Sequence, residues 1–203
     1  MQQLLDGYKR FRTEVFPHRA SLFQNLAEHQ RPSTLFITCA DSHIVPHLIT
    51  ASGPGDLFTV RNVGNLVPRH GADDSVAASI EYAVQTLKVG SITVCGHSGC
   101  AAMTALLASE SDDTSPHLTR WLRHGADSLS RFHKDQTSAS LTHANIAQQL
   151  DNLLTYPAAA RAVDTGTLRL IGMYFDIDAA RIYTLDPATG TFTVVPETTP
   201  IPT

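Results

Sequence analysis

Short apolar runs alternate with amphipathic stretches along most of the chain. The apolar runs are rich in β-branched and aromatic residues and are bounded by turn-forming residues, which predicts buried strands. These runs lie at 35–39, 57–60, 92–95 and 168–174. Apolar positions spaced near 3.6 residues predict helices. They cover 4–28 (interrupted at Pro17), 76–87, 117–133, 139–154 and 157–166, with a shorter helix-like segment at 101–108. This alternation is typical of an α/β fold with a mostly parallel central β-sheet and flanking helices.

Local signals refine this prediction. Asp73 and Asp74 precede the helix over 76–87, where acidic residues suit the helix dipole. Residues 182–185 and 192–195 flank a turn and predict a terminal hairpin. Pro46 is expected to stop any helix that begins after Ile44. Residues 110–115 are expected to form a polar loop. We predict one domain over 1–203, with an N-terminal helical arm over 1–30 that packs on a partner subunit.

Composition narrows the class of protein. At 203 residues and 42% hydrophobic, the chain can bury one sizeable core. Its net charge of -4 gives no basic surface for nucleic acid or an anionic membrane. Three cysteines are too few for a disulfide framework. The charged N-terminus lacks the apolar core of a signal peptide, and no run of about 18 apolar residues predicts a membrane span. We therefore expect a cytoplasmic location.

Three metal-ligating side chains lie where predicted strands end. Cys39 ends the strand over 35–39, and His97 and Cys100 follow the strand over 92–95. The carboxyl ends of parallel strands meet at one edge of a sheet, so these residues are expected to lie together. Two thiols and an imidazole can fill three corners of a zinc tetrahedron, which is typical of a catalytic site with one open position.

Each of these residues also has a structural interpretation. A buried cysteine is usually a small hydrophobic residue, and Cys95, inside a strand, is interpreted in that way. For His97 and Cys100 taken alone, the structural and functional interpretations are about equally favoured. Asp41 favours the functional one, because it stands two residues after Cys39, and side chains two apart on a strand point the same way.

Several motifs, taken in order, resemble those of the β-class carbonic anhydrases. They are CADSH-x-VP at 39–46, PGDLFTVRNVGNLVP at 54–68, SIEYAV-x-x-LKV at 79–89 and VCGHSGC at 94–100. Further matches lie around His29 and Asn145, so the resemblance covers nearly the whole chain. It implies a zinc lyase that interconverts carbon dioxide and bicarbonate, on a mostly parallel sheet with helices on both faces.

The resemblance also implies roles for individual residues. Cys39, His97 and Cys100 match the three protein ligands of Zn²⁺. Asp41 matches an aspartate that either binds zinc as a fourth ligand or moves away to admit water. Gln30 matches a glutamine that reaches the active site of a neighbouring subunit, which implies a homodimer or a dimer of dimers. Phe58 lies in the segment that lines the apolar carbon dioxide pocket.

Two residues depart from the family pattern. His43 stands where the family has an arginine, two residues after Asp41. Arginine holds a carboxylate with a planar, permanently charged fork, whereas histidine gives one donor and is fully charged only in acid. His43 is interpreted as a pH-dependent substitute for that arginine, as the mark of a homologue with a lost or changed reaction, or as an additional zinc ligand. Ala101 replaces the glycine that usually follows the second cysteine, and its methyl group is expected to crowd the pocket beside zinc. Neither change removes a ligand, so metal binding should survive.

Three functions remain open from the sequence. The first is hydration of carbon dioxide, weakened or gated by pH through His43. The second is turnover of another small heterocumulene such as COS or CS2, and the third is a silent zinc protein. Arg61 is expected to pin a loop or an interface. Most other histidines are expected at the surface, with His47 and His70 as proton-transfer candidates. These other histidines are at positions 18, 29, 47, 70, 117, 124, 133 and 143.

Overall fold

The computed structural model describes residues 1–108, 115–132 and 138–196. Its contacts divide the chain into two units, Met1–Arg31 and Pro32–Thr203, which are described separately. The predicted loop at 110–115 lies almost wholly outside the described residues. The assignment of 1–203 to one domain with an arm over 1–30 stays a prediction.

The N-terminal unit is helical, as its apolar spacing predicts. It contains α1 (Gln2–Arg10), two shorter helical turns (Phe11–Val15 and Phe16–His18) and α2 (Ala20–Glu28). The interruption falls at Pro17, as expected for a residue without a backbone N–H. The rings of Phe11, Phe16 and Phe23 pack together, with centroids 5.6 to 6.3 Å apart. None of the helical residues of this unit is fully buried.

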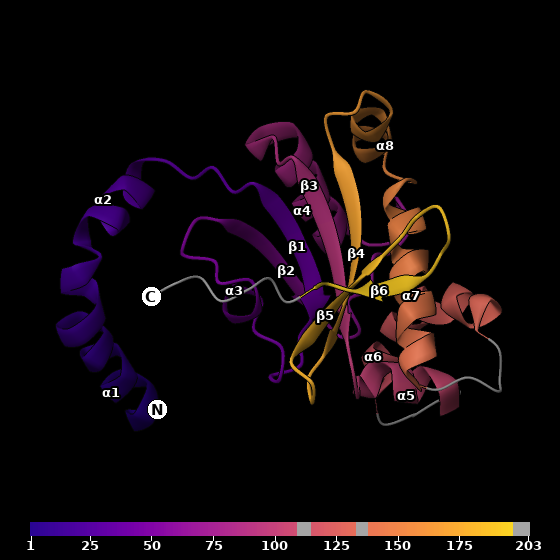
Figure 1. The fold of residues 1–203 in the computed structure, drawn as a ribbon, viewed down its shortest axis with the longest axis horizontal. Coiled ribbons are helices and arrows are strands. Elements are labelled where there is room, and N and C mark those ends of the chain that lie inside the picture. The colour runs from indigo at the N-terminus through magenta and orange to yellow at the C-terminus, as the bar shows by residue number, and fades with distance from the viewer. Residues whose placement is uncertain (109–114, 133–137, 197–203) are drawn as a thin grey trace. The chain divides into compact units, whose positions relative to one another are not determined.

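The second unit contains a six-stranded sheet of order β2-β1-β3-β4-β5-β6 (Figure 1). Strands β2, β1, β3 and β4 are parallel to one another. Strand β5 pairs antiparallel with β4, and β6 pairs antiparallel with β5. This confirms the mostly parallel sheet and the terminal hairpin. The strands are β1 (Thr34–Cys39), β2 (Leu57–Asn62), β3 (Ser91–His97), β4 (Arg169–Asp176), β5 (Arg181–Leu185) and β6 (Phe192–Val194).

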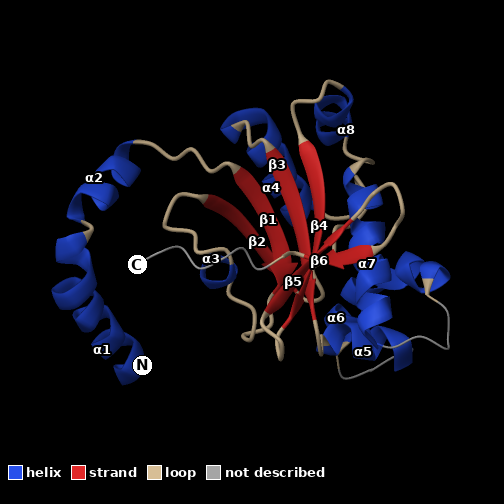
Figure 2. Cartoon of the chain, viewed as in Figure 1, coloured by secondary structure: helices blue, strands red, loops and turns tan. Residues whose placement is uncertain are grey.

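Two hydrophobic cores cover the two faces of the sheet. On β1, Leu35 and Ile37 belong to one core and Phe36 to the other. On β3, Ile92 and Val94 belong to the first core and Cys95 to the second. Strands buried on both faces have continuous apolar sequences, which is why these runs show no polar alternation. Helices accordingly flank the sheet (Figure 2).

Helices α4 (Asp74–Glu81), α5 (Ala101–Ala108), α7 (Ser138–Leu153) and α8 (Pro157–Asp164) confirm the predicted helical segments. The helix predicted over 76–87 continues from α4 as a wider turn, η3 (Tyr82–Leu87). The Asp73 side chain caps α4 by accepting a 2.8 Å hydrogen bond from the Val76 N–H. No helix in the described part of the chain is long and apolar enough to cross a membrane.

Two helix predictions need correction. Pro46 begins a short helix, α3 (Pro46–Ile49), instead of stopping one, because the first helical position needs no N–H donor. The segment over 117–133 forms α6 (Pro116–Leu122) and then a 3₁₀ segment, η4 (Arg123–Arg131).

Candidate metal centre

Three potential metal ligands converge at the carboxyl ends of β1 and β3. Cys39 ends β1, His97 ends β3, and Cys100 immediately precedes α5. The two strands are parallel neighbours, so their ends lie at one edge of the sheet. One ligand atom from each residue lies within 4.8 Å of the others, and the two sulfur atoms are 3.9 Å apart. All three side chains are buried.

His97 offers a free nitrogen to this group. Its Nδ1 lies 2.9 Å from the Ser98 carbonyl oxygen and donates to it, which leaves the Nε2 lone pair unprotonated in the neutral ring. Nε2 is buried and has no hydrogen-bond partner. A buried acceptor without a partner is costly, and a metal ion would satisfy it. Burial alone lowers the pKa of His97, but its interactions with Cys39 and Ser98 outweigh burial and raise it.

The two thiols of the group differ in acidity. A hydrogen bond from the Cys100 thiol lowers the pKa of Cys39 to about 4 against the effect of burial, and Cys100 keeps the proton, so its pKa is raised. Cys39 Sγ also accepts from the backbone N–H groups of Asp41 (3.5 Å) and Gly64 (3.4 Å). In contrast, burial raises the pKa of Cys95 to about 12, which fits its structural interpretation.

Asp41 connects His43 to the edge of the ligand group. Its Oδ1 accepts a 2.9 Å hydrogen bond from the His43 N–H and lies 2.6 Å from His43 Nδ1. Its Oδ2 lies 4.0 Å from His97 Nε2. The hydrogen bond from the His43 backbone is the main cause that lowers the pKa of Asp41, so the carboxylate stays ionised.

Arg61 holds the loop that carries Asp41 and His43. Its Nε donates to the Cys39 carbonyl oxygen at 3.1 Å, and one terminal nitrogen donates to the carbonyl oxygens of Asp41 (2.6 Å) and Ile44 (2.9 Å). These contacts agree with the expectation that Arg61 pins a loop. They fix the backbone on both sides of Asp41.

The other predicted site residues are more dispersed. Ala101 is exposed, begins α5 and is not in the left-handed region, so the methyl group there causes no backbone strain. Phe58 is half-buried on β2, and its ring centroid lies 5.7 Å from that of Tyr82. Gln30 is exposed and belongs to the N-terminal unit. The roles of these residues stay predictions.

The remaining histidines mostly lie at the surface. Four of those described are exposed, and three are half-buried, at 47, 124 and 143. His143 is the most enclosed in its contacts, because its ring stacks on Phe192 and its Nε2 is buried. His133 lies outside the described residues.

Sequence reasoning missed Gly64 and the helix behind it. The Gly64 N–H reaches Cys39 from a loop that follows β2, and its carbonyl oxygen accepts from Asn145 on α7. The available signal was weak. Gly64 lies within the VRNVGN sequence and Asn145 within one of the motifs that resemble the family, but neither bears a group that zinc ordinarily binds.

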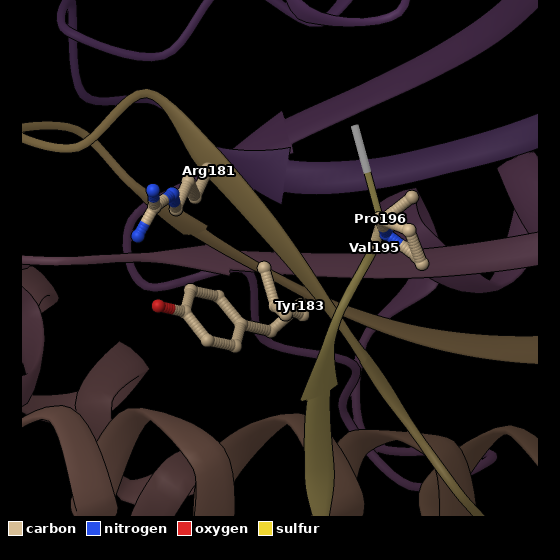
Figure 3. A pocket seen from close by; sticks show the side chains of 5 residues that line it. Arg181, Tyr183, Val195 and Pro196 are labelled. Carbon is tan, nitrogen blue, oxygen red and sulfur yellow. The ribbon is translucent and has the colours of Figure 1, made fainter. Parts of the chain in front are cut away.

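A separate hollow of ≈ 410 Å³ lies beside the terminal hairpin and takes no part in this group. It is lined by residues of β5, β6 and the two that follow, among them Arg181 and Tyr183 (Figure 3). None of the predicted site residues lines it.

Comparisons with known proteins agree with this geometry. The carbonic anhydrase family model matches residues 34–182. A carbonic anhydrase of Pseudomonas aeruginosa is 42% identical over 204 residues, which cover 97% of this chain and 93% of that protein. Carbonic anhydrase 1 of Escherichia coli O157:H7 is also 42% identical, over 95% of this chain and 91% of that protein. The chain belongs to the carbonic anhydrase family.

Solved structures identify the class within the family. The β-carbonic anhydrase CcaA is 35% identical, with a TM-score of 0.89, over 96% of this chain and 99% of that one. One of two tetrameric β-carbonic anhydrases from the filamentous ascomycete Sordaria macrospora is 30% identical, with a TM-score of 0.71, over 95% of this chain and 94% of that one. This carbonic anhydrase is therefore of the β class.

Proposed function

We propose that this protein is a zinc enzyme that interconverts carbon dioxide and bicarbonate, with Cys39, His97 and Cys100 as the zinc ligands. The observation that carries the proposal is the convergence of two sulfur atoms and one unpartnered imidazole nitrogen within 4.8 Å at the sheet edge. Two thiols and an imidazole are ligands that Zn²⁺ prefers. The relatives at 42% identity carry the name of this activity.

Bound zinc would supply a water molecule of lowered pKa as the nucleophile. Residues of the chain itself would orient that water molecule and accept its proton. Asp41 Oδ2 lies 4.0 Å from His97 Nε2 and its carboxylate is ionised, so it can accept a proton or a hydrogen bond there. His43 contacts the other oxygen of this carboxylate, and Arg61 donates a hydrogen bond to the Asp41 backbone carbonyl oxygen.

His43 is proposed to substitute for the family arginine. Its ring nitrogen lies 2.6 Å from Asp41 Oδ1 and so meets the same carboxylate, although with one donor in place of a fork. This contact favours the interpretation of His43 as an orienting partner over the interpretation as a further zinc ligand, because the group of converging ligand atoms comprises Cys39, His97 and Cys100 and does not include His43.

A stopped-flow assay of carbon dioxide hydration on zinc-loaded protein tests the proposal. We expect turnover by the wild type and its loss in Cys39→Ser, with near wild-type turnover in Cys95→Ser, since the Cys95 thiol is not one of the three converging ligands. Zinc content near one per chain is the companion measurement. Zinc-loaded protein that is inactive on carbon dioxide, or active only on COS or CS2, would contradict the proposal.

We further propose that the protein assembles as a homodimer or a dimer of dimers. The N-terminal unit exposes Leu4, Leu5 and Tyr8 on α1, and exposed apolar side chains that lie together are typical of a protein–protein contact. Light scattering coupled to size exclusion measures the assembly, and a monomer at micromolar concentration would contradict this part. A cytoplasmic location stays a prediction.

A further inference from the structure

Helix α7 carries a buried row of uncharged polar side chains. Asn145, Gln149 and Asn152 lie at successive turns of one helix face, and Tyr156 follows after the helix ends. All four are at most 2% exposed. Buried amides need partners, so this row must serve a neighbouring segment.

That segment is the loop 64–68, which follows β2. Asn145 Nδ2 donates to the Gly64 carbonyl oxygen at 3.1 Å, and Asn152 Nδ2 donates to the Val67 carbonyl oxygen at 2.8 Å. Gln149 Oε1 accepts from the Val67 N–H at 2.8 Å. The Tyr156 hydroxyl closes the row by donating to the Pro68 carbonyl oxygen at 2.6 Å.

The row is itself rigid at the end nearest the metal centre. Asn145 Oδ1 accepts from Ser128 Oγ at 3.0 Å and from Gln149 Nε2 at 2.8 Å. Its amide is therefore fixed in orientation, with Nδ2 directed at Gly64. Because hydrogen bonds fix both the oxygen and the nitrogen of the Asn145 amide, this side chain can in turn fix the position of the Gly64 backbone.

Gly64 connects this row to the candidate metal centre. Its carbonyl oxygen accepts from Asn145, and its N–H donates to Cys39 Sγ at 3.4 Å. Gly64 and Asn65 both have left-handed backbones, with φ of 83° and 49°. A loop with this conformation needs outside contacts to hold it, and the α7 row provides them.

We infer that Asn145 is a positioning residue for the metal centre: by holding Gly64, it fixes the N–H that hydrogen-bonds to the Cys39 thiolate. This inference rests on the proposed zinc site. Hydrogen bonds to a ligating sulfur orient the ligand and tune its charge, so their loss weakens metal binding by about 10- to 100-fold. A merely structural role would lower stability and leave metal affinity unchanged.

Two substitutions in the same row separate these roles. Asn145→Leu removes the contact with Gly64, whereas Tyr156→Phe removes a contact with the same loop four residues further on, at Pro68. Both leave one loop carbonyl without its donor, so both should lower Tm. Only Asn145→Leu should disturb Cys39.

The readouts are metal affinity, by competition with a chromophoric chelator, and the thiolate-to-metal charge-transfer absorption of the Co²⁺-loaded protein. We expect about 10- to 100-fold weaker zinc binding and a shifted absorption in Asn145→Leu, with affinity within about threefold of wild type in Tyr156→Phe. Asn145→Ala serves as the second variant if the leucine is not accommodated. If an Asn145 variant kept wild-type zinc affinity and a wild-type cobalt spectrum, the role given to Asn145 would be wrong and the proposed zinc site would still stand. Absence of cobalt–thiolate absorption in the wild type would overturn the zinc site as well.

Discussion

Gly64 has a conformation and surroundings that exclude a side chain. Its φ of 83° lies in the left-handed region, and an added Cβ would stand 3.0 Å from the Ala102 Cβ and 3.3 Å from the Met103 Cε. We predict that Gly64→Ala costs about 1–2 kcal/mol of unfolding free energy from the backbone alone, and more from contact with α5. It should also move the N–H away from Cys39.

Denaturant unfolding and zinc titration of Gly64→Ala measure both effects. Gly71 provides a matched control, because it too has a positive φ, of 84°, but no atom lies within 4 Å of its added Cβ. Gly71→Ala should therefore lose stability through the backbone term while keeping wild-type zinc affinity. Equal zinc affinities in the two variants would contradict the role given to Gly64.

At His43, the prediction concerns the Asp41 carboxylate. His43→Arg restores a two-pronged donor and should preserve or raise carbon dioxide hydration, whereas His43→Ala removes the ring contact and should lower it by about tenfold, the effect of roughly 1.4 kcal/mol. The backbone contact from residue 43 survives in both variants. Stopped-flow assays compare the three proteins at equal zinc content. An alanine variant as active as wild type would show that the ring does not orient Asp41.

At the scale of elements, α7 and the terminal hairpin meet through an aromatic stack. The His143 ring lies 4.1 Å from that of Phe192 on β6, nearly parallel at 13°, and meets the Tyr174 ring edge-on at 4.5 Å. Burial lowers the pKa of His143, and Arg131, a further cation, lines the same hollow. The neutral ring is therefore the form that fits this contact.

The sign of the resulting pH dependence follows. Below about pH 6.5, the ordinary pKa of histidine, the unfolded chain binds a proton at His143 that the folded chain refuses until a lower pH, so this residue's contribution to stability falls as the pH falls. His143→Phe keeps the stack without titrating. We predict that it loses less Tm between pH 7 and pH 5 than wild type does, measured by thermal unfolding. Equal losses would contradict the prediction.

The same elements explain what the sequence could predict. The runs at 35–39 and 92–95 were identifiable because both faces of these strands are buried, and their order placed Cys39 and His97 at one edge of the sheet. Pro46 was misjudged because proline both stops helices and begins them, and the choice depends on the preceding backbone.

The α7 row could not be predicted in the same way. Polar residues on an amphipathic helix normally face water, and nothing local shows that this face meets a loop some eighty residues earlier. One signal was present: the row contains amides and a tyrosine but no Lys, Arg, Asp or Glu. A solvent-exposed face of this length would ordinarily carry charges.

For the whole molecule, the proposed metal binds at the ends of strands that the sheet and its cores already hold together. Its ligands come from β1, β3 and the residue before α5, whereas Leu35, Ile37, Ile92 and Val94 are fully buried in a core on the sheet. We therefore predict that zinc removal leaves the sheet folded and loosens the loops around the site. A ligand that binds only the folded state at a thousandfold excess over its Kd adds about 4 kcal/mol of stability, so Tm should fall by roughly 8–16 °C on chelation.

Hydrogen exchange with and without chelator tests where that loss occurs. Protection should fall at residues 39–44, 64–68 and 97–101, which carry the ligands or contact Cys39. It should change little in β4 and in the rest of β1 and β3, whose amides are held by the parallel ladder. Cys100→Ser should reproduce the chelated pattern without chelator, because it removes one ligand and leaves the ladder intact. Collapse of protection across the whole sheet would instead mean that the metal is required for folding, and that the two cores are too weak to hold the strands together alone.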